Sequence, residues 1–364
     1  MKSPERPQSC RILHLISSLQ VGGLEQFALR MAHFQRVNGQ DAQIITLKDG
    51  HLRAEAERLK VPVTLISGGK LKRVISGVTR FRSLAPDIIH AHNTPVLNYA
   101  LLGKRSSHAP IVLTLHGRGK NDSRSPTPAL WKQTDAIVAV SQFVAEDWKE
   151  AGKPIQVILN GVQFSEPQRT REDVRKELGI AEVRLLGMVV ARMDALKGHE
   201  TLLKALSLLS DSLPDFTFCF AGDGDKRGEW EALARSLGIA EDRVRFLGFR
   251  NDVPDLLAAS DFFVLPSYSE GLPLSVLEAM SHGLPLISTN VGGVPEIIQN
   301  EKDGLLVPPR NEAALAKALT CLLTDKTLRS RLGNVAKNRV EADFSFERMS
   351  QDYSVLYSQL LSNL

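Results

Sequence analysis

The sequence predicts an α/β protein built on parallel sheets, and three observations support that fold class. Short apolar runs alternate with longer amphipathic runs along the chain, which is typical of strand-helix-strand units with parallel strands. Gly, Pro, Asn and Asp separate the runs, as expected of turns. The length of 364 residues and a hydrophobic content of 43% suffice for two to three domains, each with its own core. We therefore expect doubly wound parallel sheets.

The composition argues against a membrane-spanning protein and against a disulfide framework. No run reaches the roughly 18 apolar residues of a membrane span, and the first ten residues, MKSPERPQSC, lack an apolar signal-peptide core. Cys10, Cys219 and Cys321 are far apart and have no metal-ligand spacing, so we expect reduced, structural cysteines, with Cys219 in the core. A soluble, cytoplasmic protein is the expectation.

The charge is unevenly distributed. Residues 1–165 hold 22 Lys and Arg against 12 Asp and Glu, a net +10, and the remaining residues hold 23 against 29, a net −6. A basic first half favours attraction to an anionic acceptor or an anionic membrane surface, although a variation in surface charge without function is the alternative. Nucleic-acid binding is not predicted, because no aromatic residues are interleaved with the basic ones.

A glycine turn follows the first predicted strand. The apolar run RILHLISSL (residues 11–19) leads through Gly22-Gly23 into a helix that ends at Asn38-Gly39. The turn is not GxGxxG, so the dinucleotide-binding fingerprint is absent from it. A glycine pair lets the backbone approach a ligand that a Cβ would exclude, and a plain tight turn is the alternative interpretation.

Three histidines lie at the ends of later predicted strands, where parallel sheets bind ligands. His116 closes the strand IVLTLHG and precedes a polar, basic loop, Gly117–Pro128, of a composition that can select an acceptor. His92 is a weaker candidate, and His90, which alternates inward, is expected in the core. No metal site is predicted from these histidines, because none has a carboxylate at the usual spacing.

The second half places two cations at a strand-to-helix turn. The strand LLGMVVA ends at Arg192, and Lys197 opens the next helix. Such a pair can clamp a diphosphate, with Arg bidentate and Lys as a point charge, whereas a solvated surface pair is the alternative. Asp223-Gly-Asp225 has the form of a metal-binding DxD motif, but we expect this segment to be a turn between a strand and a helix.

The stretch from Pro266 to Glu296 holds two glutamates around a helix start. After the buried strand, a loop carries Glu270, and the helix that begins near Pro273 carries Glu278 about 1.5 turns inside. Unpaired backbone N–H groups at a helix start suit a phosphate. A carboxylate beside them can accept hydrogen bonds from both hydroxyls of a ribose.

Glu270 and Glu278 within SEGLPLSVLEAM, followed by STNVGGVPEII and DGLLVPP, resemble the signature of the retaining glycosyltransferases of family 4, the group 1 type. The resemblance implies the GT-B fold, with two Rossmann-like domains facing each other across a cleft. It implies an acceptor-binding domain at 1–165, a nucleotide-sugar-binding domain at 166–342, and a helix at 343–364 that crosses back to the first domain. Asn160-Gly161-Val162 matches the family's junction turn, with Leu159 where proline is usual and Gln163 where aspartate is.

The resemblance also implies the activity and the site. The reaction would be transfer of a sugar from a nucleotide diphosphosugar, a UDP-sugar in the first instance, to a hydroxyl of a glycan or lipid-linked acceptor, with retention and without metal or other cofactor. Assembly of a bacterial envelope polysaccharide or a glycolipid, such as lipopolysaccharide, is the family's common setting. The basic first half of the chain favours a peripheral position at the inner face of the cytoplasmic membrane. The implied catalytic residues are His116, Glu270, Arg192 and Lys197, and the implied donor-binding residues are Gly22, Gly23, Arg192, Lys197, Phe249, Arg250, Glu270, Gly271, Leu272, Pro273, Leu274 and Glu278.

Two other functions stay open at this point. A nucleotide-sugar epimerase on the same architecture would isomerise the donor without an acceptor, and the two-glutamate context argues against it. A nucleotide- or glycan-binding module without activity would keep the fold, and the intact Arg192, Lys197, Glu270 and Glu278 argue against that.

Overall fold

The computed structural model describes residues 10–20, 22–117, 131–149 and 152–363, and it divides into two compact units. Unit 1 holds residues 1–159 and 350–364, and unit 2 holds 160–349. The division differs from the predicted one at 165 and 342, because the backbone N–H of Val162 bonds the carbonyl of Phe344 and that of Phe346 bonds the carbonyl of Val162. These bonds tie residues 160–165 to unit 2. Most of the predicted Gly117–Pro128 loop lies outside the described residues.

Unit 1 alternates strands and helices as the sequence predicts. In order, its elements are β1 (Arg11–Ile16), α1 (Gly23–Val37), β2 (Asp41–Thr46), α2 (Leu52–Arg58), β3 (Val63–Leu65), α3 (Lys70–Leu84), β4 (Ile88–Ala91), the 3-10 turn η1 (Thr94–Val96), α4 (Leu97–Ser107), β5 (Ile111–Leu115), β6 (Ala136–Ala139), α6 (Gln142–Asp147), β7 (Ile155–Val157) and the part of α15 (Phe346–Ser362) from Ser350 onward.

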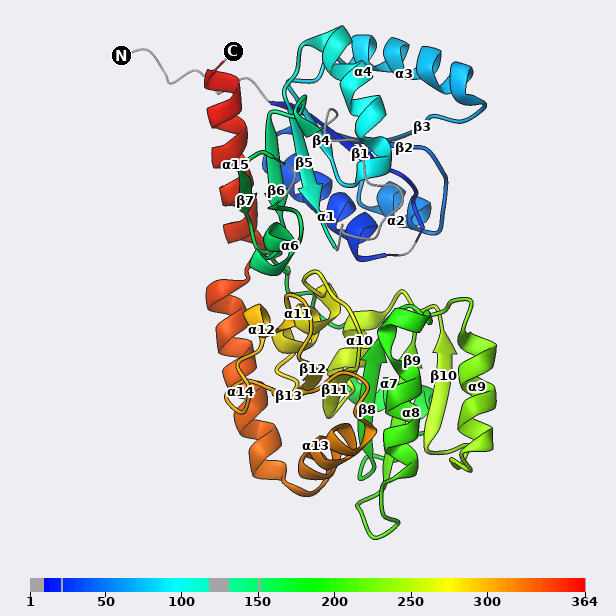
Figure 1. Ribbon diagram of the computed structural model, residues 1–364. Helices are drawn as coiled ribbons and strands as arrows, with labels where there is room; N and C mark the ends of the chain where they lie inside the picture. Colours follow the sequence, from blue (N-terminus) through cyan, green and yellow to red (C-terminus); the bar gives the residue numbers. More distant parts are fainter. Residues whose placement is uncertain (1–9, 21, 118–130, 150–151, 364) are drawn as a thin grey trace. The chain divides into compact units, whose positions relative to one another are not determined.

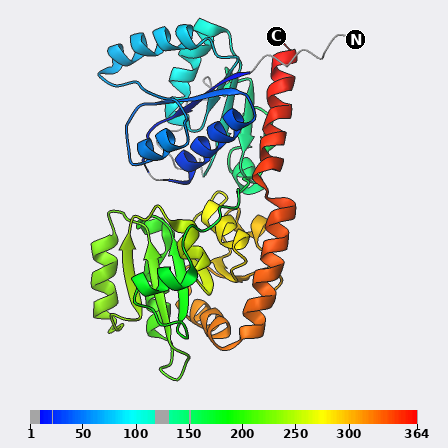
Figure 2. The ribbon, with the colours of Figure 1, turned by 180° about the vertical axis from the view of Figure 1, so that it is seen from behind.

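The seven strands of unit 1 form one parallel sheet in the order β3-β2-β1-β4-β5-β6-β7. The inner strands are buried on both faces, which explains why they read as continuous apolar runs rather than alternating ones. Figure 2 shows α1 and α2, in blue, in front of these strands. The chain order reverses between β1 and β4, and ligands of doubly wound sheets bind at such a switch point.

Unit 2 follows the same pattern. Its elements are α7 (Arg171–Glu177), β8 (Leu185–Val190), the 3-10 turn η3 (Ala195–Lys197), α8 (His199–Ser207), β9 (Phe216–Ala221), α9 (Arg227–Ser236), β10 (Val244–Gly248), α10 (Val253–Ala258), β11 (Phe262–Leu265), α11 (Leu274–Ser281), β12 (Leu286–Thr289), α12 (Val294–Ile297), β13 (Leu305–Val307), α13 (Glu312–Thr324), α14 (Lys326–Asp343) and the first residues of α15.

The six strands of unit 2 are also parallel, in the order β10-β9-β8-β11-β12-β13. Phe218, Phe220 and Phe262 are fully buried between the sheet and helices such as α8, which Figure 1 shows in front of β8. Cys219 on β9 is fully buried, as predicted. The chain order reverses between β8 and β11, so the loops after these two strands flank a second switch point.

No helix in the described part of the chain is both long enough and apolar enough to cross a bilayer.

Candidate active site

An ion pair joins the two loops at the switch point of unit 2. Lys197 Nζ, at the end of η3 after β8, lies 2.7 Å from Glu270 Oε1, in the loop after β11. Ser267 donates a second hydrogen bond, of 2.6 Å, to the same carboxylate oxygen. The side chains of Lys197 and Glu270 are 22% and 8% exposed, so each is the counter-charge that makes burial of the other tolerable.

Close backbone contacts bring these loops together. The N–H of Tyr268 bonds the carbonyl of Leu196 at 2.7 Å. Gly198 has φ +67°, and a Cβ there would lie 1.9 Å from the carbonyl oxygen of Pro266. On the other side, Gly292 has φ +56°, and its Cβ would lie 1.8 Å from the carbonyl oxygen of Glu270. Both positions require glycine, since L side chains rarely adopt these angles and no space is left for them.

Arg192 lies in the loop between β8 and η3, the loop that also leads to Lys197. Its guanidinium contacts Asp194 at 3.1 Å, and its side chain is 61% exposed. Asp194 in turn caps η3 by accepting the N–H of Leu196 at 2.9 Å. The structure therefore brings Lys197 and Glu270 into contact and places Arg192 near them on an accessible loop.

The predicted helix after Glu270 is α11, which begins at Leu274 with Pro273 as its N-cap. The N-cap makes no side-chain hydrogen bond, so the N–H groups of the first turn are not satisfied by a capping side chain. Glu278 is the fifth residue of this helix, as expected. The amide of Asn160 donates to the carbonyl of Leu272 at 3.1 Å and thereby fixes the segment between Glu270 and the helix.

Phe249 and Arg250, which follow β10, differ in their environment. The Phe249 side chain is 45% exposed, as a stacking platform requires. The guanidinium of Arg250 bonds both carboxylate oxygens of Asp252, at 2.7 and 2.6 Å, and contacts Glu177 at 2.9 Å. The Arg250 side chain is thus held in an ion-pair network. A ligand at this position would therefore contact the backbone of Arg250 or the side chain of Phe249.

The Asp223-Gly-Asp225 segment forms the predicted turn between β9 and α9. Asp223 accepts the N–H of Gly224 at 2.8 Å with its side chain and the N–H of Met193 at 3.0 Å with its carbonyl. A Cβ on Gly224 would lie 2.4 Å from the carbonyl oxygen of Met193. The Asp223 side chain therefore stabilises a tight turn against the Arg192 loop.

In unit 1, the Gly22-Gly23 turn and His116 lie at the same end of the sheet. Gly22 is the N-cap of α1, and because it is a glycine the start of this helix has no side-chain cap. Apart from its chain neighbours and its own helix backbone, no atom of the described residues lies within 4 Å of the position of a Cβ on Gly23. One turn further along α1, Phe27 packs its ring edge-on against His116, with centroids 4.9 Å apart.

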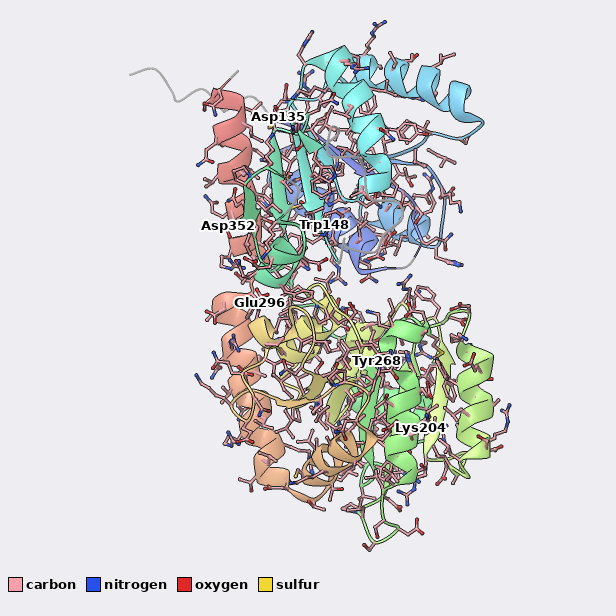
Figure 3. The ribbon with its side chains drawn as sticks, viewed as in Figure 1. Asp135, Trp148, Lys204, Tyr268, Glu296 and Asp352 are labelled. Carbon is pink, nitrogen blue, oxygen red and sulfur yellow. The ribbon has the colours of Figure 1, made fainter. Side chains whose placement is uncertain are left out.

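His116 is half-buried at the end of β5 and held from two sides. Its Nε2 lies 3.4 Å from His92 Nδ1. The indole N–H of Trp148, which Figure 3 labels, donates to the carbonyl of the next residue, Gly117, at 2.9 Å. Burial lowers the pKa of His116 to about 3, so its imidazole is neutral near pH 7.

Behind His116 lies a group of buried histidines. His90 on β4, His92 directly after β4 and His14 on β1 are fully buried, which agrees with the expected core position of His90. Burial is the main cause that lowers the pKa of all three, to about 4 for His14. One nitrogen from each lies within 4.8 Å of the others, a spacing that permits a metal ion.

Two family models match the chain. Residues 21–166 match Glycosyltransferase Family 4, and residues 170–339 match Glycosyl transferases group 1. N-acetyl-alpha-D-glucosaminyl L-malate synthase of Bacillus anthracis is 31% identical over 288 residues, which are 76% of this chain and 75% of that protein. The chain belongs to glycosyltransferase family 4, group 1. It is therefore an enzyme of the glycosyltransferase class, as the motifs predict.

Other members and structures agree with this assignment. UDP-Gal:alpha-D-GlcNAc-diphosphoundecaprenol alpha-1,3-galactosyltransferase of Escherichia coli is 27% identical over 312 residues, 80% of each chain. The crystal structure of Anabaena Alr3699/HepE in complex with UDP and glucose superposes with a TM-score of 0.84 at 24% identity, over 96% of this chain and 99% of that one. Together with the two parallel-sheet units, this likeness confirms the predicted GT-B fold.

The sequence analysis did not identify several residues that hold the candidate site of this glycosyltransferase in place. Gly292 belongs to the quoted motif STNVGGVPEII and Gly198 directly follows Lys197, but only the structure shows which carbonyl each glycine approaches. Asn160 was interpreted as a junction marker, whereas its amide bonds the Glu270 loop. The sequence did not indicate a role for His14 or Gln35, since a polar residue within an apolar strand or helix face does not reveal its hydrogen-bond partner.

We expect the glycosyltransferase to lose stability on acidification because of its buried histidines. The folded-state pKa values of His14 and His116 lie near 4 and 3, below 6.5, so the unfolded chain binds protons first. Stability is then complete above about pH 6.5 and falls as the pH drops toward 4, by about 1.4 kcal/mol per pH unit for each histidine. Urea unfolding at a series of pH values measures this slope.

A pair of variants tests the cause of this slope. His90→Gln removes one buried histidine and should reduce the slope by about one histidine's share, whereas His51→Gln, at an exposed position, should leave it unchanged. Equal slopes for His90→Gln and the wild type would contradict the assignment.

Proposed function

We propose that this glycosyltransferase transfers a sugar from a UDP-sugar to a hydroxyl of a glycan or lipid-linked acceptor, with retention at the anomeric carbon and without a metal. The observation that carries the proposal is the Lys197–Glu270 pair at the switch point, with Arg192 on the same loop. It sets two cations and a carboxylate where doubly wound sheets bind ligands.

The cations supply the electrostatic part of the reaction. Departure of the nucleoside diphosphate develops negative charge on the phosphates, and donors fixed in advance stabilise that charge most effectively. Lys197 acts as a point charge and the accessible Arg192 as a bidentate donor. The N–H groups at the start of α11, which no N-cap side chain satisfies, would contact the same diphosphate.

Glu270 would orient the donor sugar rather than attack it. Its Oε1 already accepts bonds from Lys197 and Ser267, and no hydrogen bond from the described residues reaches Oε2. Oε2 is thus available to a sugar hydroxyl, beside the backbone of Gly271 to Leu274. A same-face displacement, in which the donor phosphate helps to deprotonate the acceptor, requires no protein nucleophile. Glu278 would hold the ribose, and Phe249 with the backbone of Arg250 would contact the base.

Relatives support the donor and acceptor classes. The E. coli relative is named for a UDP-sugar donor and a diphosphoundecaprenol-linked acceptor, and the Anabaena structure contains UDP. The basic first half of the chain favours an anionic acceptor or an anionic membrane surface. We propose action at the cytoplasmic face of the membrane, in assembly of a cell-envelope polysaccharide such as lipopolysaccharide.

The direct test is an assay of the purified enzyme with UDP-glucose, UDP-galactose and UDP-N-acetylglucosamine in excess EDTA, with lipid-linked and free glycan acceptors. We expect sugar transfer, or slow donor hydrolysis without acceptor, for at least one donor, and a product of retained configuration. Loss of all activity in EDTA with recovery in Mn²⁺ would contradict the metal-free proposal. Isomerised donor without transfer would indicate an epimerase instead.

Lys197→Ala should lower turnover about tenfold or more, because it removes one charge from the developing diphosphate. The matched control is Lys204→Ala, which removes a lysine from α8 that pairs with Glu200 at 2.6 Å and is labelled in Figure 3. Measurement of kcat and donor KM below the melting temperature of each variant separates catalysis from folding. Near-normal turnover of Lys197→Ala would remove it from the site.

A further inference from the structure

Four side chains in unit 1 form a continuous hydrogen-bonded chain from helix α1 to His116. Gln35 Oε1 lies 2.7 Å from His14 Nε2, and His14 Nδ1 lies 2.8 Å from His92 Nε2. The last link, from His92 Nδ1 to His116 Nε2, is 3.4 Å and therefore the weakest. Apart from His116, the members are buried.

The hydrogen bonds that link these four side chains all run in one direction, and Gln35 determines that direction. A neutral imidazole carries one N–H and one lone pair, so each ring donates at one nitrogen and accepts at the other. An amide oxygen can only accept, so His14 must donate from Nε2 and accept at Nδ1. His92 then donates from Nε2 and accepts at Nδ1, and His116 donates from Nε2. The proton of His116 is thereby placed on Nε2, and its Nδ1 carries the lone pair.

A second branch fixes the orientation of the Gln35 amide. Burial raises the pKa of the Tyr357 hydroxyl, and a hydrogen bond from Gln35 opposes the rise. The amide oxygen is the atom that lies 2.7 Å from His14 Nε2, which leaves the NH₂ of Gln35 for the Tyr357 hydroxyl. Were the amide reversed, every proton along the chain would move to the other nitrogen.

The same contacts argue against a metal among these histidines. His90 Nδ1 bonds the Tyr357 hydroxyl and His90 Nε2 bonds Thr114 Oγ1, both at 2.7 Å. With the bonds above, both nitrogens of His14, His90 and His92 have partners. Metal binding would break several of these bonds inside a buried cluster, and no carboxylate within it would balance the charge of the ion.

His116 Nδ1 is the open end of this chain. Among the described residues none bonds Nδ1, and His116 is half-buried directly after the carboxyl end of β5, the end at which doubly wound sheets bind ligands. A ring nitrogen with a lone pair accepts a hydrogen bond from a hydroxyl, and it repels another acceptor. His116 Nδ1 therefore selects an O–H donor over a phosphate or carbonyl oxygen.

We propose that Gln35 is a positioning residue which, through His14 and His92, holds His116 in the Nε2–H tautomer so that its Nδ1 accepts a hydrogen bond from a sugar hydroxyl of the reactants. The role of the hydroxyl rests on the proposed function, whereas the tautomer does not. A fixed tautomer means that the correct protonation of His116 does not have to be selected at each turnover.

The wild-type enzyme without ligand provides the first test. Long-range ¹H–¹⁵N correlation spectra of ¹⁵N-histidine-labelled protein distinguish the two tautomers, and single His→Gln variants assign the nine histidines. We expect Nε2–H at His14, His92 and His116. Nδ1–H at His116, or a stoichiometric zinc ion bound by the cluster, would overturn the proposal. This result is independent of whether any sugar donor is turned over.

Gln35→Met provides the second test, since methionine keeps the length of the side chain and removes the strict acceptor. We expect His116 to become a mixture of tautomers and kcat to fall about tenfold, the loss that corresponds to one hydrogen bond, with little change in donor KM. The matched control is Tyr353→Phe, which removes a buried hydroxyl 3.0 Å from Thr114 at the end of the other branch. We expect it to leave the tautomers and kcat unchanged.

Unchanged tautomers in a folded Gln35→Met enzyme would overturn the proposal, as would an equal loss of kcat in Tyr353→Phe. If Gln35→Met does not fold, the wild-type spectrum still decides. If the tautomer is as expected but no donor is turned over, the proposed function fails and the positioning role of Gln35 stands.

Discussion

The candidate site of this glycosyltransferase depends on one ion pair, between Lys197 and Glu270. The two side chains come from loops after β8 and β11, on either side of the point where the strand order of unit 2 reverses. The pair can form only because Gly198 and Gly292 let backbone segments approach within distances that a Cβ would exclude. A largely buried ion pair adds little net stability, because desolvation offsets its attraction. Its value lies in holding a cation and a carboxylate ready at the ligand-binding end of the sheet.

The two units present different chemistry at the carboxyl ends of their sheets. In unit 2 the candidate groups are charged, and each has a counter-charge close by. In unit 1 they are neutral imidazoles, whose burial lowers their pKa values far enough to keep them uncharged near pH 7. The charged groups of unit 2 suit an anionic ligand, and the neutral, directed hydrogen bonds of unit 1 suit an uncharged ligand with hydroxyl groups.

Much of the fold was predictable because its strands are buried on both faces and therefore read as apolar runs between helices. The placement of Glu270 in a loop and of Glu278 inside a helix followed from Pro273 and the helical spacing after it. The contact between Lys197 and Glu270 did not, since 73 residues separate them and strand order cannot be read from periodicity. The histidine chain was hidden for a similar reason. Gln35 lies on helix α1, His14 on β1, and His92 and His116 directly after β4 and β5, and only the sheet order makes them neighbours.

The most direct test of the account is donor binding at the Lys197–Glu270 pair. Thermal unfolding of the full chain in EDTA would be followed with UDP, GDP and ADP, for the wild type, Lys197→Ala and Lys204→Ala. A nucleotide at about 100 times its Kd adds about 2.7 kcal/mol, which raises the melting temperature by several degrees. The account predicts this rise with UDP for the wild type and Lys204→Ala and its loss in Lys197→Ala. No rise with any nucleotide, or an equal rise in Lys197→Ala, would contradict it.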